Sequence, residues 1–193
     1  MIENNKVMTI VGIFEPYIYS IKFDNEESDE YSRLLEEWSD MEKVKDFFER
    51  NKSYMSDYMS KCIKNFYEAA EQVSDEADAL EYTLCDLYEN TQNGIEPDFD
   101  SFFKPLDGLY SLSIDYMPTK SYGNGRPPLI RMYAIKIISN VYVITDGGIK
   151  IAKKIQESPE LKDHVFKKIN QVREFLKFHN IISSEDLKTY CDE

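Results

Sequence analysis

The chain of 193 residues has little of the chemistry that most familiar sites require. It contains 2 His, 3 Cys, 1 Trp and 7 Gly. So few histidines disfavour a catalytic triad or a histidine-rich metal centre. Three widely spaced cysteines disfavour a disulfide framework or a zinc site. No phosphate-binding glycine loop, dinucleotide fingerprint or nucleophile elbow is found. We therefore expect neither a cofactor nor a metal.

Long apolar runs are also missing. No stretch approaches the roughly 18 consecutive apolar residues that a membrane span needs, and no secretory signal is recognisable at the start. Hydrophobic residues make up 42% of the chain and aromatic residues 13%, which is enough for a core. We expect a single domain over residues 1–193, cytoplasmic and away from membranes, with Cys62 and Cys85 in its core as reduced thiols.

Charge is distributed unevenly in a chain whose net charge is −13. Residues 1–100 hold 25 acids and 9 bases, whereas residues 101–193 hold 11 acids and 14 bases. The excess of bases is greatest within 118–177, which has 12 bases and 5 acids. Electrostatic fields decay within about 10 Å at moderate salt, so this segment can bind an anion although the whole chain is acidic. Alternatively, these lysines simply face water.

Apolar periodicity predicts the elements of the first hundred residues. Residues 7–14 and 17–23 are rich in β-branched and aromatic side chains, which favours two strands joined by a turn. Apolar spacings of three and four then predict helices over 28–95. We expect a break near Ser39-Asp40. Residues 55–91 fit either one long helix or two, and Ser74-Asp75 is the candidate break between the two.

The rest of the chain predicts more strands and a helix. Residues 109–116 read as extended, and 120–128, with two Gly and two Pro, as the most flexible stretch. Strands over 129–138 and 141–145 flank a two-residue turn, and the second is expected to break at Asp146-Gly147-Gly148. A helix over 159–180 buries five apolar residues, Leu161, Val165, Ile169, Val172 and Leu176.

These elements predict an α+β fold. A small antiparallel sheet, formed by 7–23 and 104–155, is flanked by helices. The acidic helical segment 28–95 is an insertion between the two parts of the sheet.

Four short motifs follow one another in the second half: KPLDGL at 104–109, LIRMYAIKI at 129–137, VYVITDGGIKIAKK at 141–154 and SPE at 158–160. Their order resembles the RelE/HigB-like toxin superfamily, over roughly 104–177. This resemblance implies a small sheet with flanking helices, ribosome-dependent cleavage of messenger RNA, and an antitoxin protein as partner.

Cleavage of RNA without a metal requires cations that stabilise the charge on the scissile phosphate, and a group that moves a proton. Arg131 and Tyr133 project from one face of their strand and Lys136 from the other. The resemblance implies that Arg131 or Lys136 is the strand cation and that Lys153 and Lys154 are the basic pair. The candidate catalytic residues are Arg131, Tyr133, Lys136, Lys153 and Lys154, and the candidate RNA-binding residues are Tyr122, Arg126 and Lys150. His164 and His179 are expected at the surface or at a helix end.

Two other functions remain open. The chain is alternatively a non-enzymatic interaction module of phage or mobile-element origin, whose acidic helices bind a protein; a stable homodimer indifferent to RNA would favour it. A weaker alternative is that the acidic helices mimic nucleic acid and block a nucleic-acid-binding protein.

Overall fold

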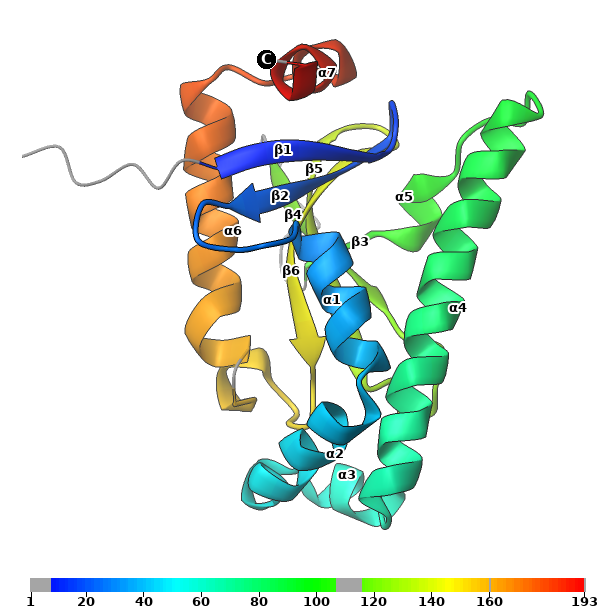
Figure 1. Ribbon diagram of the computed structural model, residues 1–193, viewed down its shortest axis with the longest axis vertical. Coiled ribbons are helices and arrows are strands. Elements are labelled where there is room, and N and C mark those ends of the chain that lie inside the picture. Colours follow the sequence, from blue (N-terminus) through cyan, green and yellow to red (C-terminus); the bar gives the residue numbers. More distant parts are fainter. Residues whose placement is uncertain (1–7, 107–115, 160, 193) are drawn as a thin grey trace, which may run out of the picture.

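The computed structural model of the protein describes residues 8–106, 116–159 and 161–192. Within this part of the chain, helices pack on both faces of a six-stranded sheet of order β1-β2-β6-β5-β4-β3, as Figure 1 shows. The predicted α+β class is therefore confirmed. The strands are β1 (Met8–Phe14), β2 (Ile18–Phe23), β3 (Lys104–Pro105), β4 (Met117–Tyr122), β5 (Ile130–Ile138) and β6 (Val141–Ile149).

The prediction of a small, antiparallel sheet was wrong. The sheet is mixed, because β2 and β6 run parallel where Ile18–Ser20 lies beside Tyr142–Ile144. Parallel neighbours need a long connection, and the chain between β2 and β6, which includes the helical segment, provides one. The pairing of β2 with β6 ends at Ser20 and Ile144. Beyond this point the edge of β6 that faces β2 is flanked by helices.

The helices alternate with short turns. The break predicted at Ser39-Asp40 is confirmed, because the Asp40 side chain accepts a hydrogen bond from Lys43 N and caps the second helix. Residues 55–91 form two helices, one of the two alternatives, but the division lies at 63–65, where Asn65 is the N-cap of the second helix, and not at Ser74-Asp75. The α-helices are α1 (Glu30–Ser39), α2 (Met41–Arg50), α3 (Asp57–Cys62), α4 (Phe66–Gln92), α5 (Phe99–Phe102), α6 (Leu161–Phe178) and α7 (Ser184–Asp192), with 3₁₀ turns η1 (Lys52–Tyr54) and η2 (Ile155–Glu157).

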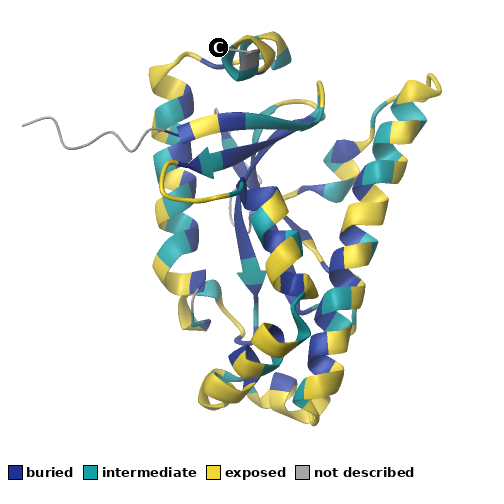
Figure 2. Cartoon of the chain, in the orientation of Figure 1, coloured by how far each residue is buried: buried dark blue, intermediate teal, exposed yellow. Residues whose placement is uncertain are grey.

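The sheet has a core on each face. Helices α1, α2 and α4 lie on one face and α6 on the other, while α7 packs against β1 (Figure 1). The five apolar residues predicted to face inward on α6 are all buried. The exposed faces of α4 and α6 alternate with buried ones in Figure 2, as expected for amphipathic helices.

The glycine pair in β6 lets helices approach both faces of the strand. A Cβ on Gly147 would come within 2.7 Å of the Arg131 carbonyl oxygen and of Leu34 in α1. A Cβ on Gly148 would come within 2.8 Å of Leu161 in α6. Strand β6 continues through these glycines to Ile149, because each of them pairs with a residue of β5. The break predicted at Asp146-Gly147-Gly148 was wrong.

The segment predicted to be most flexible, 120–128, begins inside a strand. Lys120 and Ser121 are buried in β4, which pairs with β5 from Met117↔Lys136 to Tyr122↔Arg131. Its polar composition concealed the strand, since periodicity alone cannot detect pairing with a distant partner. The extended stretch predicted over 109–116 lies almost wholly outside the described residues.

The cysteine prediction failed at one position. Cys62 ends α3 and is exposed, whereas Cys85 in α4 is partly buried. Helix α3 has only six residues and buries only Met59, so its last residue remains in solvent.

Candidate functional site

Several of the predicted site residues meet at a cavity of about 600 Å³. Three chain segments form it: the start of α3, the residues that lead into β5, and the residues that follow β6. Arg131, Lys150 and Lys153 all contribute to the lining, as do aromatic, apolar and acidic groups. The lining residues are Ser56, Asp57, Tyr58, Met59, Pro127, Pro128, Arg131, Lys150, Ala152 and Lys153.

Arg131 is held in one position at this cavity. Its Nη1 donates hydrogen bonds to the carbonyl oxygens of Ile130 at 2.7 Å and Pro128 at 3.1 Å, and its guanidinium lies 4.4 Å from the centre of the Tyr122 ring. Burial lowers the pKa of Arg131, but an arginine still carries its charge at neutral pH. Tyr122, predicted to bind RNA, thus lies against the cation that lines the cavity.

The lysines after β6 are more exposed. The Nζ of Lys150 donates a hydrogen bond to the Lys153 carbonyl oxygen at 2.9 Å, which folds this segment back on itself. Lys153 is exposed and lines the cavity, whereas its exposed neighbour Lys154 does not. Arg126 is exposed beside the lining prolines.

A buried carboxylate on α4 fixes one wall of the cavity. Glu76 accepts hydrogen bonds from the backbone N–H groups of Leu129 and Ile130 at 2.9 and 3.0 Å. The Nε2 of Gln72 donates to Glu76 at 2.7 Å and to the Pro127 carbonyl oxygen at 2.8 Å. The 127–130 segment is therefore anchored to α4, a constraint that no local sequence pattern indicated.

Two of the predicted catalytic residues lie elsewhere. Tyr133 is fully buried under α6, beside Leu161 and Val165. Lys136 projects to the opposite face, as predicted, and its Nζ lies 2.8 Å from Asp100 at the end of the β5–β6 hairpin. The structure thus brings together Arg131, Lys150 and Lys153 at the cavity, with Tyr122 against Arg131. Tyr133 is not in the lining, although its charge acts on Arg131, and Lys136 lies on the other face of the sheet.

Asp100 organises the hairpin end where Lys136 lies. It accepts hydrogen bonds from Lys136, Ser139, Asn140 and Tyr142 at 2.7 to 2.8 Å. Burial would raise the pKa of Asp100, but these donors outweigh it and lower that pKa to about 2. Burial and this same carboxylate raise the pKa of Tyr142. This cluster holds α5 to the hairpin, which is a structural role.

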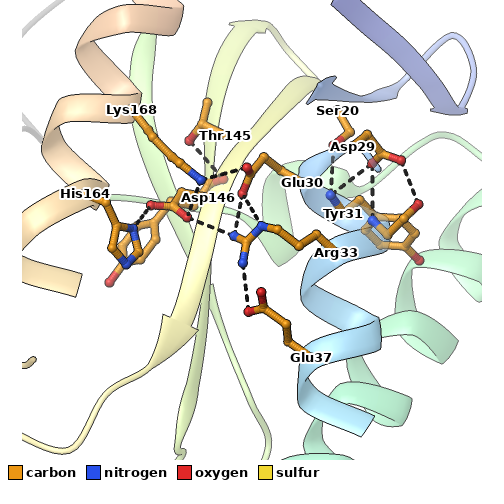
Figure 3. Close-up of polar contacts among 12 residues, drawn as sticks. Ser20, Asp29, Glu30, Tyr31, Arg33, Glu37, Thr145, Asp146, His164 and Lys168 are labelled. Carbon is orange, nitrogen blue, oxygen red and sulfur yellow. Dashed lines mark hydrogen bonds and ion pairs between the residues drawn. The ribbon is translucent and has the colours of Figure 1, made fainter. Parts of the chain in front are cut away.

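A second charged cluster lies where α1 and α6 flank the unpaired edge of β6 (Figure 3). Its centre is Asp146, whose side chain is fully buried and whose carboxylate contacts the Nδ1 of His164. Arg33 of α1 lies 3.2 Å from the same carboxylate, and Lys168 of α6 lies 3.6 Å from it. Lys168 also pairs with the buried Glu30 at 2.7 Å. We call Glu30, Arg33, Asp146, His164 and Lys168 the β6-edge network.

Charges in the β6-edge network are matched closely. Arg33 contacts Glu30 as well as Asp146, and Glu37 at 2.8 Å on its solvent side. Burial would lower the pKa of Arg33, but the hydrogen bond and charge of Glu30 outweigh it and raise that pKa. Two buried carboxylates are thereby matched by two cations, as burial of charge requires.

The sequence contained only a weak signal for this network. His164 and Lys168 are four residues apart, so they share a helix face, but nothing local connects them to Asp146 or to Arg33. His164 was predicted at the surface or at a helix end; its side chain is 34% exposed and bound to a buried acid. His179 follows the end of α6 and contacts the rings of Phe175, Phe178 and Tyr190.

Comparisons with known proteins do not identify the chain. No protein-family model, no curated protein and no solved structure matches it. Among the described residues, no group of three or more His, Cys, Asp or Glu side chains is placed to hold a metal ion. No helix in that part of the chain is long and apolar enough to cross a membrane. The function must therefore be argued from the site.

Proposed function

We propose that the protein acts on RNA as a RelE/HigB-like toxin-type protein, and that it binds a single-stranded segment in the cavity of Arg131, Lys150 and Lys153. One observation carries this proposal. Cations about twenty residues apart in sequence line one cavity next to an exposed tyrosine, Tyr58, in a chain whose net charge is −13. Ribosome-dependent cleavage of messenger RNA is the activity that the family resemblance implies.

The cavity offers the two kinds of group that bind single strands. Lysine and arginine side chains attract the phosphates, and aromatic rings stack on unpaired bases. Tyr58 is 63% exposed and Tyr122 is 41% exposed, so both rings are accessible to a base. Arg131 is already ordered by its carbonyl and ring contacts, so binding costs little further side-chain entropy.

The size and surroundings of the cavity favour a short stretch of RNA. A volume of about 600 Å³ is in the range of small-molecule sites. Helix α4, with eight acids and no Lys or Arg, would repel a longer polyanion along its own surface. The proposal is thus for one loop or end of a strand in the cavity.

A binding experiment tests this proposal. Fluorescence anisotropy with a short single-stranded RNA, and co-sedimentation with ribosomes, are measured at low and at physiological salt. We expect binding that weakens as salt rises, with a slope set by the few phosphates contacted. An absence of affinity for both RNA and ribosomes at low salt would contradict the proposal.

Induced expression in a bacterial host tests the toxin-like activity. Growth arrest is expected from the wild type, and not from an Arg131→Ala/Lys150→Ala/Lys153→Ala triple variant that is equally soluble. Arrest by both proteins would show that the cavity is not responsible. Co-expressed proteins that relieve the arrest would be candidates for the antitoxin.

A second candidate function rests on α4. Seven of its eight acids are exposed, with Tyr67 and Tyr82 exposed among them, while Glu76 alone is buried. Such a surface fits a non-enzymatic module that binds a basic protein partner. Loss of partner binding on charge reversal of this face, in a protein indifferent to RNA, would favour this function over the first.

A further inference from the structure

Arg131 is nearly enclosed by protein, yet part of its hydrogen-bonding capacity is unused. The residue is 8% exposed, and only its Nη1 donates to protein, namely to the carbonyl oxygens of Pro128 and Ile130. Its Nε and Nη2 have no hydrogen-bond partner among the described residues, and neither nitrogen is fully shut off from solvent. Buried polar groups in proteins are normally hydrogen-bonded, so these N–H groups at the cavity are open to a ligand.

The open N–H groups select an anion that has a pair of oxygens. Nε and Nη2 lie in one plane at one edge of the guanidinium and match two oxygens of a phosphate or carboxylate. The Tyr122 ring lies over the guanidinium, so a ligand approaches this edge and not that face. Lys153 lines the same cavity, and its ammonium has no ion-pair partner among the described residues. Both cations can therefore bind an oxyanion that enters the cavity.

The walls of the cavity are fixed on two sides. On one side, Glu76 accepts hydrogen bonds from two backbone N–H groups of the 127–130 segment. On another, the backbone N–H of Ser56 donates to the Ile151 carbonyl oxygen at 3.1 Å, which ties the start of α3 to the segment after β6. The cavity is thus preformed, and a group that contacts Arg131 must enter the cavity rather than open it.

This requirement distinguishes the end of an RNA strand from its interior. A phosphodiester inside a strand has two ester oxygens, so the chain must leave the cavity in two directions. A terminal phosphate has one ester oxygen and needs only one way out. It also carries about −1.5 to −2 charge near neutral pH, more than a diester. The lining has three cations, Arg131, Lys150 and Lys153, against Asp57, with Glu76 behind the wall. The excess of positive charge favours the more highly charged group.

The α3 side of the cavity suits the nucleoside that carries such a phosphate. Tyr58 is 63% exposed and lines the cavity beside Met59, and unpaired bases stack on tyrosine rings. The carboxylate of Asp57 has no partner among the described residues. It repels a phosphate, but it accepts hydrogen bonds from ribose hydroxyls. The two sides therefore orient the ligand, with its phosphate toward the end of β6 and its base toward α3.

We propose that the cavity recognises a phosphate monoester at the end of single-stranded RNA, with the phosphate on Arg131 and Lys153 and the terminal base on Tyr58. This inference rests on the proposed function and deepens it, because it replaces an unspecified single-stranded segment by a phosphorylated end. The same chemistry is present in a 5′-phosphate, in a 3′-phosphate and in a free mononucleotide. The volume of about 600 Å³ suits a ligand of this size.

A comparison of RNA ends tests the inference. One short single-stranded RNA, labelled at an internal position, is prepared with a 5′-phosphate, with a 3′-phosphate, with hydroxyls at both ends, and as a closed circle. Fluorescence anisotropy at physiological salt gives the affinity for each form, and AMP and inorganic phosphate are added as competitors. We expect one phosphorylated end to bind at least about 10-fold more tightly than the hydroxyl-ended and circular forms.

Variants assign this preference to the cavity. Arg131→Lys keeps the charge but loses the planar edge, and Lys153→Gln removes an exposed ammonium. Each should reduce the preference for the phosphorylated end to about 2-fold, since a contact with the phosphate is lost. Lys154→Gln removes the same charge one residue outside the lining and should keep the preference. Thermal melting confirms that each variant is folded; if Arg131→Lys does not fold, Lys153→Gln decides alone.

The outcomes separate this inference from the proposed function. Equal affinity for the phosphorylated, hydroxyl-ended and circular forms overturns the inference and leaves the proposed RNA binding intact. A preference for the phosphorylated end that the Arg131 and Lys153 variants both retain also overturns the inference, because recognition then lies outside the cavity. Binding of AMP without binding of RNA overturns the proposed function and supports the cavity as a nucleotide site. An absence of affinity for RNA, AMP and phosphate alike overturns both.

Discussion

The protein has two clusters of charge that differ in how their cations are satisfied. In the β6-edge network, Arg33 and Lys168 face the buried carboxylates of Glu30 and Asp146. At the cavity, Arg131 is held by carbonyl oxygens and the ring of Tyr122. Carbonyls and rings orient a cation without cancelling its charge. The first cluster therefore contributes to stability and holds His164, whereas the positive charge of the second is offset in part by the carboxylates of Glu76 and Asp57.

The largest expected effect is a loss of stability when the β6-edge network loses one of its buried carboxylates. Asp146→Ala leaves Arg33 and Lys168 without one of their two buried partners, and we expect it to lower the free energy of unfolding by about 3–5 kcal/mol. Urea denaturation measures this. The control Glu37→Gln removes an acid that is 51% exposed and should cost less than about 1 kcal/mol. Equal losses in the two variants would show that burial does not distinguish the acids of the network.

The next effect concerns the wall of the cavity. Glu76→Ala leaves the N–H groups of Leu129 and Ile130 without their acceptor, and should cost about 2–3 kcal/mol of unfolding free energy. RNA affinity should fall as well, because the 127–130 segment then no longer holds Arg131 in place. Glu71→Ala, at an exposed acid five residues earlier in α4, is the control and should change neither quantity appreciably.

A smaller effect is expected at the cavity, on the affinity for RNA. Lys153→Glu should weaken RNA binding by about 10-fold, since it replaces an attraction to phosphate by a repulsion. Lys154→Glu makes the same change of charge one residue outside the lining and should weaken binding by about 2-fold. Anisotropy titrations at two salt concentrations compare them. Equal losses would mean that only the general field matters, and not the cavity.

The smallest effect is a pH dependence of stability outside both clusters. The pKa of Asp100 is lowered to about 2 in the folded state, so its stabilising contribution is complete above the ordinary value near 4. That contribution is lost as the pH falls from about 4 to about 2. The side chain is 35% exposed, so we expect about 1 kcal/mol after discounting for solvent. Asp100→Asn should flatten this part of the stability profile, measured by denaturant titration at each pH.

The elements that the sequence predicted well are those with strong local patterns. The hairpin around Glu15-Pro16, the break at Asp40 and the buried face of α6 all follow from spacing and capping within a few residues. Strand β4 was missed because its inward residues include Thr119 and Ser121, which break apolar alternation. Three of the ten lining residues were candidates from the sequence: Arg131, Lys150 and Lys153 stood out as bases in an acidic chain, but the α3 wall did not.

The sequence by itself determined the fold class, the amphipathic helices and the separation of acidic from basic halves, because these properties reside in neighbouring residues. Only the tertiary structure decided the parallel pairing of β2 with β6, the burial of Tyr133, and the meeting of Asp146 with Arg33 and His164. Those contacts join residues 18 to more than 100 positions apart. Their free energy arises when the two faces of the sheet are covered and water is excluded from the edge of β6, which no local pattern encodes.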